Sequence, residues 1–336
     1  MKATTSCPPA TPTAAGIPFQ LILAPIRGIT DWVYRSVFQR HFQGFDLAVA
    51  PFIATVPSSR FAPRLLKDVL PENNRGMRII PQLLGKTPAD FIRMARCLHD
   101  LGHETVNWNL GCPYPMVARK GRGSGLLPFP EKIQVFLDHV VPAIPNRLSV
   151  KTRLGREEPG EIRQVLGVLN QFPLTDLIVH PRTGIQMYTG TIHRDMFRWC
   201  LENSRHPVIY NGDITDTRTF GELRRLFPDV GTFMIGRGAL ADPFLPAELR
   251  GLKPPTPPEK VAALKRFHDD LLAAYTPLFS GPAHLTDRMK AHWQYWAASF
   301  ADGAKLLKAV RKTRHVDAYR ITIEQLFSRG LTWKSG

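Results

Sequence analysis

Short apolar runs recur along residues 19–238, and a segment of helical periodicity follows each of them. The runs are hydrophobic almost throughout, which is typical of parallel strands buried on both faces. Eight strand-and-helix units in about 220 residues predict a (β/α)8 TIM barrel over residues 18–250, so the expected fold class is α/β. The runs are FQLILAP (19–25), FDLAVAPF (45–52), MRIIPQLLG (77–85), ETVNWNLG (104–111), LSVKTRLG (148–155), TDLIVHPR (175–182), HPVIYNGD (206–213) and GTFMIGRG (231–238).

The first strand-to-helix turn separates the barrel from its main alternative, a doubly wound open sheet. Open sheets of that kind usually have fewer strands and a glycine-rich first turn. The turn here, APIRGITD (24–31), contains no G-x-G-x-x-G motif. The barrel is therefore the favoured fold.

The pattern changes on either side of the barrel. Residues 1–17 are rich in Thr, Pro and Ala and lack the apolar core of a signal peptide, so we expect a disordered tail. Four prolines in GLKPPTPPEK (251–260) predict a stiff linker over residues 251–258. Beyond it, helical periodicity predicts a separate, smaller all-helical domain over residues 259–336.

Charge is the next informative feature. The 336-residue chain has 44 Lys and Arg against 28 Asp and Glu, a formal net charge of +16. Residues 251–336 hold 14 basic and 7 acidic residues, so their net positive charge per residue is more than twice that of residues 1–250. This excess indicates a polyanionic partner. A membrane surface is disfavoured because there is no basic amphipathic anchor, and an RNA-binding helical domain is expected.

Composition excludes several classes of protein. A hydrophobic content of 43% is too high for a wholly disordered chain, and no stretch reaches the roughly 18–20 uncharged apolar residues of a membrane-spanning helix. The four cysteines form no C-x-x-C pair and no metal-ligand spacing, so neither a disulfide scaffold nor a metal site is expected. We expect a cytoplasmic monomer with no obligate protein partner.

Polar residues stand near the carboxyl ends of the third to eighth predicted strands, where a barrel has its active site. The last two strand ends, NGD (211–213) and GRG (236–238), are typical of a phosphate site, because glycine lets backbone N–H groups approach an anion. Arg237 adds a charge that can pair with phosphate. The ring of polar residues comprises Gln82, Asn109, Lys151, His180, Asn211, Asp213 and Arg237.

Lys151 and Cys112 are the candidate reactive groups. Lys151 lies in an apolar strand, where an ammonium needs an anionic partner or a lowered pKa. A Schiff-base lysine, a cation facing an electron-rich cofactor ring and a structural ion pair all fit that position. Cys112 follows the fourth strand on a loop with Gly and Pro, where a protonated general acid and a thiolate nucleophile are both open. GRGSG (121–125) is expected to be a flexible piece of this loop and not a dinucleotide site.

A set of short motifs extends along the whole barrel: APIRGITD (24–31), PQLLG (81–85), NLGCP (109–113), GSGLL (123–127), VKTRLG (150–155), VHPRTGIQMY (179–188), NGDI (211–214) and IGRGAL (235–240). In these motifs and their order, the chain resembles the tRNA-dihydrouridine synthases, flavoenzymes that reduce the C5–C6 double bond of uridine in tRNA. The tail segment DRMKAHWQYW (287–296) is similar to that of the bacterial branch acting on uridine 16 of the D-loop.

The resemblance implies a mechanism and a set of binding residues. Reduced FMN would deliver hydride to uracil C6, Cys112 would donate a proton to C5, and NADPH would be the reductant. Lys151 would lie near the N1/O2 edge of the flavin. The residues expected to bind FMN are Pro25, Ile26, Arg27, Gln82, Lys151, His180, Asn211, Gly212, Asp213, Gly236 and Arg237.

RNA contacts are expected from both parts of the chain. Asn109 would hold the flipped uracil, and Arg153 and Arg182 would lie near RNA phosphates. In the basic tail, Arg288 and Lys290 flank Met289 just ahead of an aromatic run, and they are the candidate RNA-binding residues there.

The chain also departs from the family pattern. Ile26 and Arg27 replace a usual Met and a small or acidic residue, and Pro181 stands where Gly is common. The pair Tyr114-Pro115 is unusual as well. None of these departures removes a reactive group. Two other functions stay open: a flavin-dependent barrel reductase of a free pyrimidine or enone, and a catalytically retired barrel that binds RNA.

Overall fold

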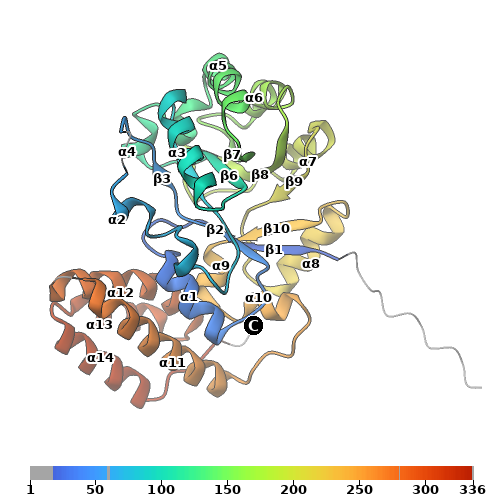
Figure 1. Ribbon diagram of the computed structural model, residues 1–336. Helices are drawn as coiled ribbons and strands as arrows, with labels where there is room; N and C mark the ends of the chain where they lie inside the picture. The colour runs from blue at the N-terminus through green and yellow to red at the C-terminus, as the bar shows by residue number, and fades with distance from the viewer. Residues whose placement is uncertain (1–17, 59–60, 280, 335–336) are drawn as a thin grey trace, which may run out of the picture.

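The computed structural model describes residues 18–58, 61–279 and 281–334. The predicted disordered tail, residues 1–17, lies outside the described residues. The described chain forms a curled sheet surrounded by helices, with a group of C-terminal helices against one side (Figure 1).

All pairings in the sheet are parallel, in the order β3-β5-β6-β7-β8-β9-β10-β1-β2-β4. β4 and β5 lie on either side of Pro81, which has no N–H for the ladder. β4 and β5 are two parts of one strand. β4 pairs with β2 and β5 pairs with β3, so the first and last strands of the order lie next to each other and the sheet closes into a barrel. The strands are β1 (Gln20–Leu23), β2 (Leu47–Val49), β3 (Ile53–Ala54), β4 (Ile79–Ile80), β5 (Gln82–Leu84), β6 (Thr105–Leu110), β7 (Arg147–Gly155), β8 (Leu174–Thr183), β9 (Val208–Tyr210) and β10 (Thr232–Ile235).

This arrangement confirms the predicted barrel. Each of the eight apolar runs contains at least one strand, and the run 77–85 contains both β4 and β5. The carbonyl of Pro81 still accepts the N–H of Asn107 at 2.8 Å, which keeps the interrupted strand bonded to β6.

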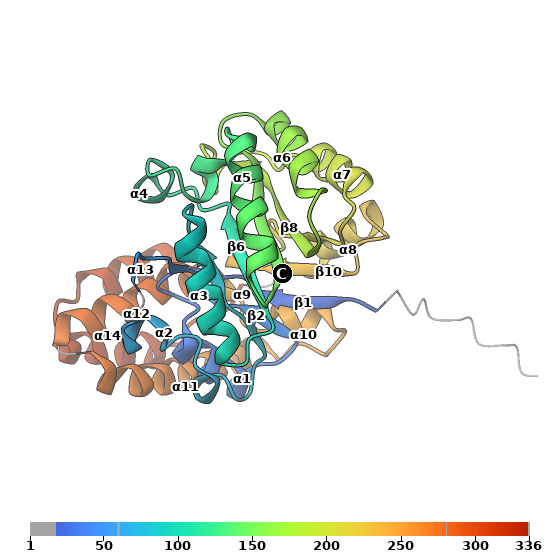
Figure 2. The ribbon, with the colours of Figure 1, turned by 45° about the horizontal axis from the view of Figure 1, so that its top comes forward.

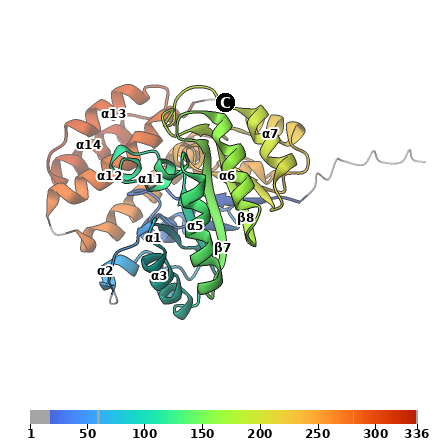
Figure 3. The same ribbon diagram turned by 90° about the horizontal axis from the view of Figure 1, so that it is seen from above.

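Helices cover the outside of the sheet (Figures 2 and 3). Their buried faces pack on the strands; for example, the Trp108 ring of β6 stacks on Phe136 with centroids 4.1 Å apart. The α-helices are α1 (Trp32–His41), α2 (Pro63–Leu66), α3 (Pro88–Asp100), α4 (Pro115–Ala118), α5 (Pro130–Val140), α6 (Ile162–Leu169), α7 (Arg194–Asn203), α8 (Thr217–Leu226), α9 (Arg237–Ala241) and α10 (Leu245–Leu249). Short 3-10 helices are η1 (Pro71–Asn73), η2 (Gly123–Leu126), η3 (Val141–Ala143) and η4 (Pro159–Glu161).

The region after residue 250 is helical, as its periodicity predicts. Its first helix begins at Pro257, inside the proline run, because proline is tolerated at the first helical position and Thr256 forms a capping box with Glu259. Its helices are α11 (Pro257–Tyr275), η5 (Thr276–Leu278), α12 (Pro282–Trp296), η6 (Ala297–Ser299), α13 (Gly303–Lys312) and α14 (Val316–Ser328).

The C-terminal helices share an apolar core with the barrel. Phe267 of α11 packs edge-on against Tyr34, Phe38 and Phe42, which lie on or just after α1. This contact fixes the helical region beside the loop between β1 and α1, near the barrel mouth. Within the described residues, none of the helices is both long and apolar enough to span a bilayer.

Candidate active site

A cavity of roughly 1210 Å³ opens at the carboxyl ends of the barrel strands and extends to the helical region. Most of the residues predicted to bind a cofactor line it, which places them in one site despite their distance in sequence. Gln82, Arg182, Arg288 and Lys290 do not line it. The predicted residues on its wall are Pro25, Ile26, Arg27, Asn109, Cys112, Lys151, Arg153, His180, Asn211, Gly212, Asp213, Gly236 and Arg237.

Cys112 follows β6 and is 8% exposed on the cavity wall. Its backbone N–H donates to Asn109 Oδ1 at 2.8 Å, and the same oxygen accepts the N–H of Gly111 at 3.1 Å. The amide of Asn109 in turn donates to Gln82 Oε1 at 2.8 Å. Gln82 is fully buried and also donates to Asn107, and its hydrogen bond with Asn109 links it to the cavity wall. Gln82 therefore supports Asn109 by a hydrogen bond, and its contact with a cofactor stays a prediction.

Gly123, Ser124 and Gly125 are buried in η2, which corrects the expectation that GRGSG is a flexible loop. Ser124 donates its N–H to the Cys112 carbonyl at 3.0 Å. Gly123 has φ +56°, and a Cβ there would lie 2.7 Å from the Cys112 carbonyl oxygen and 2.9 Å from its Cβ. Glycine at this position therefore allows the close approach that holds Cys112 in place.

The Cys112 thiol stays protonated at neutral pH. Burial raises its pKa, and this outweighs the lowering effects of the Tyr114 backbone N–H and of the charges on Arg153, Arg27 and Lys151. A neutral thiol is a proton donor, so of the two roles open for Cys112 the geometry favours the general acid.

Positive charge accumulates around the middle of the cavity. Burial, together with the nearby Arg153, lowers the pKa of Lys151 to about 7. No hydrogen bond or ion pair of the Lys151 ammonium is found within the part of the chain that the structure describes. Burial and the charges of Arg153 and Lys151 hold the pKa of His180 well below its usual value, so that ring is neutral. An anionic or electron-rich ligand would relieve this concentration of charge.

Asp213, which follows β9, binds one arginine from the end of β8, Arg182, and one that follows β10, Arg237. Arg182 donates to its two carboxylate oxygens at 3.0 and 2.5 Å, and Arg237 donates at 2.6 Å. Burial alone would raise the pKa of Asp213, but these two arginines hold it below its usual value. Asp213 is therefore a carboxylate that orients Arg237.

Gly212 and Gly236 directly precede Asp213 and Arg237 in the chain, and both glycines line the cavity wall. A Cβ on Gly212 would lie 3.3 Å from Pro181 Cδ, and one on Gly236 would lie 3.3 Å from Ala24 Cβ. The Asn211 amide donates to the Met234 carbonyl at 2.8 Å and ties these strand ends together. The donor set of glycine backbone and an oriented arginine suits a phosphate group.

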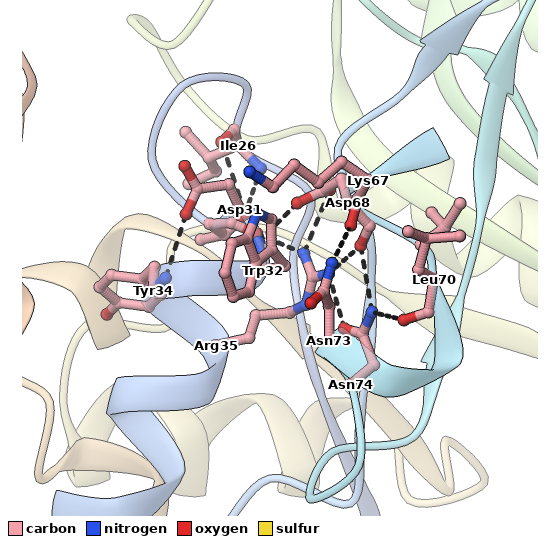
Figure 4. A network of polar contacts seen from close by, with 12 residues as sticks. Ile26, Asp31, Trp32, Tyr34, Arg35, Lys67, Asp68, Leu70, Asn73 and Asn74 are labelled. Atoms are coloured by element: carbon pink, nitrogen blue, oxygen red, sulfur yellow. Dashed lines mark hydrogen bonds and ion pairs between the residues drawn. The ribbon is translucent and has the colours of Figure 1, made fainter. Parts of the chain in front are cut away.

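Pro25, Ile26 and Arg27 line the cavity from the loop between β1 and α1, and Arg35 of α1 supports this loop by hydrogen bonds (Figure 4). The Arg35 guanidinium donates to the Thr30 carbonyl at 2.7 Å and to both the Asp68 carbonyl and Asn74 Oδ1. Arg35 is buried, so this loop has a rigid support.

The same loop is held from the helical region by Arg288. Its guanidinium lies 3.1 Å from Asp31 Oδ2 and donates to the Gly28 carbonyl. Lys290 donates to the Thr313 carbonyl and lies near Asp287. Both basic residues make contacts within the protein, and their contact with RNA stays a prediction.

Sequence reasoning assigned no role to Tyr188, which lines the cavity. The guanidinium groups of Arg153 and Arg237 lie 5.2 and 5.0 Å from the centroid of its ring. The preceding Met187 has φ +52°, a left-handed conformation that is uncommon outside glycine and that aims Tyr188 into the site. The position of Tyr188 at the end of the motif VHPRTGIQMY was the sequence feature that could have identified it as a site residue.

With this geometry in view, comparisons with known proteins identify the class. The family model "Dihydrouridine synthase (Dus)" matches residues 22–322. Because this match spans most of the chain, the protein belongs to the dihydrouridine synthase family.

Three relatives are similar over most of the chain. A tRNA-dihydrouridine(16) synthase of Cupriavidus necator is 29% identical over 87% of this chain and 92% of its own. One of Ralstonia nicotianae is 31% identical over 69% of this chain and 73% of its own. A tRNA-dihydrouridine synthase B of Klebsiella pneumoniae is 29% identical over 74% of this chain and 78% of its own.

A solved structure supports the fold independently. An old yellow enzyme homologue of Zymomonas mobilis superposes with a TM-score of 0.51 over 72% of this chain and 93% of its own. At 12% identity this likeness shows the barrel fold alone.

Proposed function

We propose that the protein is a tRNA-dihydrouridine synthase that uses FMN and NADPH to reduce uridine 16 in the D-loop of tRNA. The observation that carries this proposal is the protonated thiol of Cys112 on the wall of a cationic cavity, in a chain of this family. The position rests on two relatives named tRNA-dihydrouridine(16) synthases. NADPH is proposed from the family resemblance.

The residues around the cavity fit FMN. Gly212, Gly236 and Arg237 line the cavity, and glycine backbone near an arginine suits the FMN phosphate. Lys151 supplies an unpaired cation and His180 a neutral ring farther into the barrel, which suits an electron-rich heterocycle. When bound and reduced, FMN supplies the hydride that uracil C6 receives.

The chain's own residues supply the proton and the geometry. Cys112 holds a proton at Sγ for uracil C5, and its raised pKa keeps that proton available at neutral pH. Asn109 fixes the Cys112 backbone, so the thiol is positioned before substrate binds. A uridine must leave its stack to reach such a cavity, and the excess positive charge of the chain suits the grip on RNA phosphates that this requires.

Incubation of the purified protein with an unmodified tRNA transcript and NADPH tests the proposal. We expect a yellow protein that releases FMN on denaturation and a transcript that carries dihydrouridine at position 16. A colourless protein that cannot be reconstituted with FMN, or a transcript without dihydrouridine, would contradict it. Modification at another D-loop position would refute only the choice of uridine. Turnover of free uridine as fast as tRNA would indicate a small-molecule reductase.

A further inference from the structure

Tyr114 stands two residues after Cys112 and has a proline on each side. A residue before proline is confined to extended backbone, and Tyr114 has φ −57° and ψ 133°. Pro115 is the first residue of α4. The backbone around Tyr114 is therefore held at a fixed place beside the reactive thiol.

The Tyr114 side chain is exposed on the cavity wall. It is 49% exposed, and Met116 on the same loop is 68% exposed. The Tyr114 ring centroid lies 6.5 Å from that of Tyr188, which comes from the loop after β8. Tyr295 of α12 lines the same cavity from the helical side. Large side chains left exposed together at a cavity usually mark a binding surface.

The surrounding charge indicates what this surface binds. Arg27, Lys151, Arg153 and Arg237 line the same cavity. Aromatic rings interleaved with cations are the arrangement that proteins use for unpaired nucleotides, because bases stack on the rings while phosphates meet the cations.

We propose that Tyr114 is a substrate-positioning residue that stacks on the unpaired nucleobase next to the target uridine. The inference rests on the proposed function, because a neighbouring base exists only if the substrate is RNA. When the target uridine leaves its stack, its neighbour loses a stacking partner. The Tyr114 ring takes that partner's place while the uridine lies beside Cys112.

The test uses the FMN-loaded protein and an unmodified tRNA transcript. Tyr114→Ala and Tyr114→Leu remove the flat ring, whereas Tyr114→Phe keeps it. Ile321→Ala is the matched control, because Ile321 is an exposed apolar residue of α14 outside the cavity. We expect the first two variants to raise the Kd and KM for tRNA about tenfold, the order of one base–aromatic stack. Tyr114→Phe and Ile321→Ala should stay within about twofold of the parent, and flavin reduction by NADPH should be unchanged throughout.

A transcript with 2-aminopurine next to the target uridine gives a direct readout of stacking. Its fluorescence should be quenched by the parent protein and less so by Tyr114→Ala. Parent-like Kd and quenching in Tyr114→Ala and Tyr114→Leu would overturn the proposal, as would equal losses in Tyr114→Phe. If the parent makes no dihydrouridine, the proposed function fails, while the binding comparison still decides the role of Tyr114.

Discussion

The side-chain oxygen of Asn109 accepts the backbone N–H of Cys112 at 2.8 Å. Gln82 holds the other end of the Asn109 amide at 2.8 Å, so a buried chain of hydrogen bonds runs from β5 through β6 to the thiol loop. Buried networks of this kind fix one conformation, because breaking them leaves polar groups unpaired.

Asn109→Ala should therefore release the Cys112 loop. We expect iodoacetamide to alkylate Cys112 faster in this variant than in the parent at neutral pH, because a looser loop exposes the thiol. Peptide mass spectrometry separates Cys112 from the other cysteines. Asn170→Ala is the control, since Asn170 bonds the Asn203 carbonyl on the opposite, exposed side of the barrel. Equal alkylation rates in Asn109→Ala and the parent would show that Asn109 does not hold the loop.

Gly123→Ala tests the close contact on the other side of Cys112. Its Cβ would meet the Cys112 carbonyl at 2.7 Å in a left-handed backbone conformation, so we expect lower stability and loss of most tRNA reduction. Gly167→Ala is the matched control: Gly167 lies within α6 and nothing is within 4 Å of its Cβ position. That change should keep activity and stabilise the protein by about 0.5–1 kcal/mol in urea denaturation. Full activity in Gly123→Ala would mean that the loop tolerates displacement.

Lys151 predicts a pH dependence of flavin binding. Its pKa of about 7 in the ligand-free protein means that it is charged below pH 7 and loses its proton above it. An anionic ligand favours the charged form, so the contribution of Lys151 to the affinity of apoprotein for FMN should be constant below pH 7 and should decrease as the pH rises from 7 toward 9. Titration by flavin fluorescence measures this slope. Lys151→Arg should remove the slope because arginine stays charged, and Lys151→Met should bind weakly at every pH. A parent affinity independent of pH would contradict the prediction.

Arg288→Ala separates a structural role from an RNA contact. Its guanidinium pairs with Asp31, which also caps α1 and accepts the Tyr275 hydroxyl at 2.8 Å. Removing one partner of this half-buried pair should lower the free energy of unfolding by about 1–3 kcal/mol. Arg311→Ala, an exposed change on α13, should change stability by less than about 0.5 kcal/mol. If Arg288→Ala weakens tRNA binding but leaves urea stability intact, the contact with Asp31 is not structural.

The barrel could be predicted because strands buried on both faces leave a clear record in sequence. Runs such as 175–182 and 206–213 have a continuous apolar centre, LIV and VIY, and a strand covers that centre in each case. The polar residues at their carboxyl ends met at one mouth because parallel strands all point the same way. That geometry placed Cys112, Lys151 and His180 in one cavity from sequence alone.

Other features depended on side-chain contacts across the fold. The hydrogen bonds of Gln82 to Asn107 and Asn109 could not be predicted from its position near a strand end. Arg288 has the same sequence signature whether it faces solvent or Asp31. The left-handed backbone conformation of Met187 could not be predicted either, because methionine rarely adopts it. The contacts of Gln82 and Arg288 are made with residues distant in sequence, so hydrophobic periodicity cannot predict them.

The central claim is that Cys112 gives the proton in a reduction of tRNA. The most direct measurement compares the parent with Cys112→Ala, following flavin reduction by NADPH and dihydrouridine formation in the same tRNA transcript. The account predicts that Cys112→Ala binds FMN and is reduced by NADPH at the parent rate, while dihydrouridine formation falls at least about 100-fold, the usual contribution of a general acid. Dihydrouridine formation at the parent rate in Cys112→Ala would contradict it.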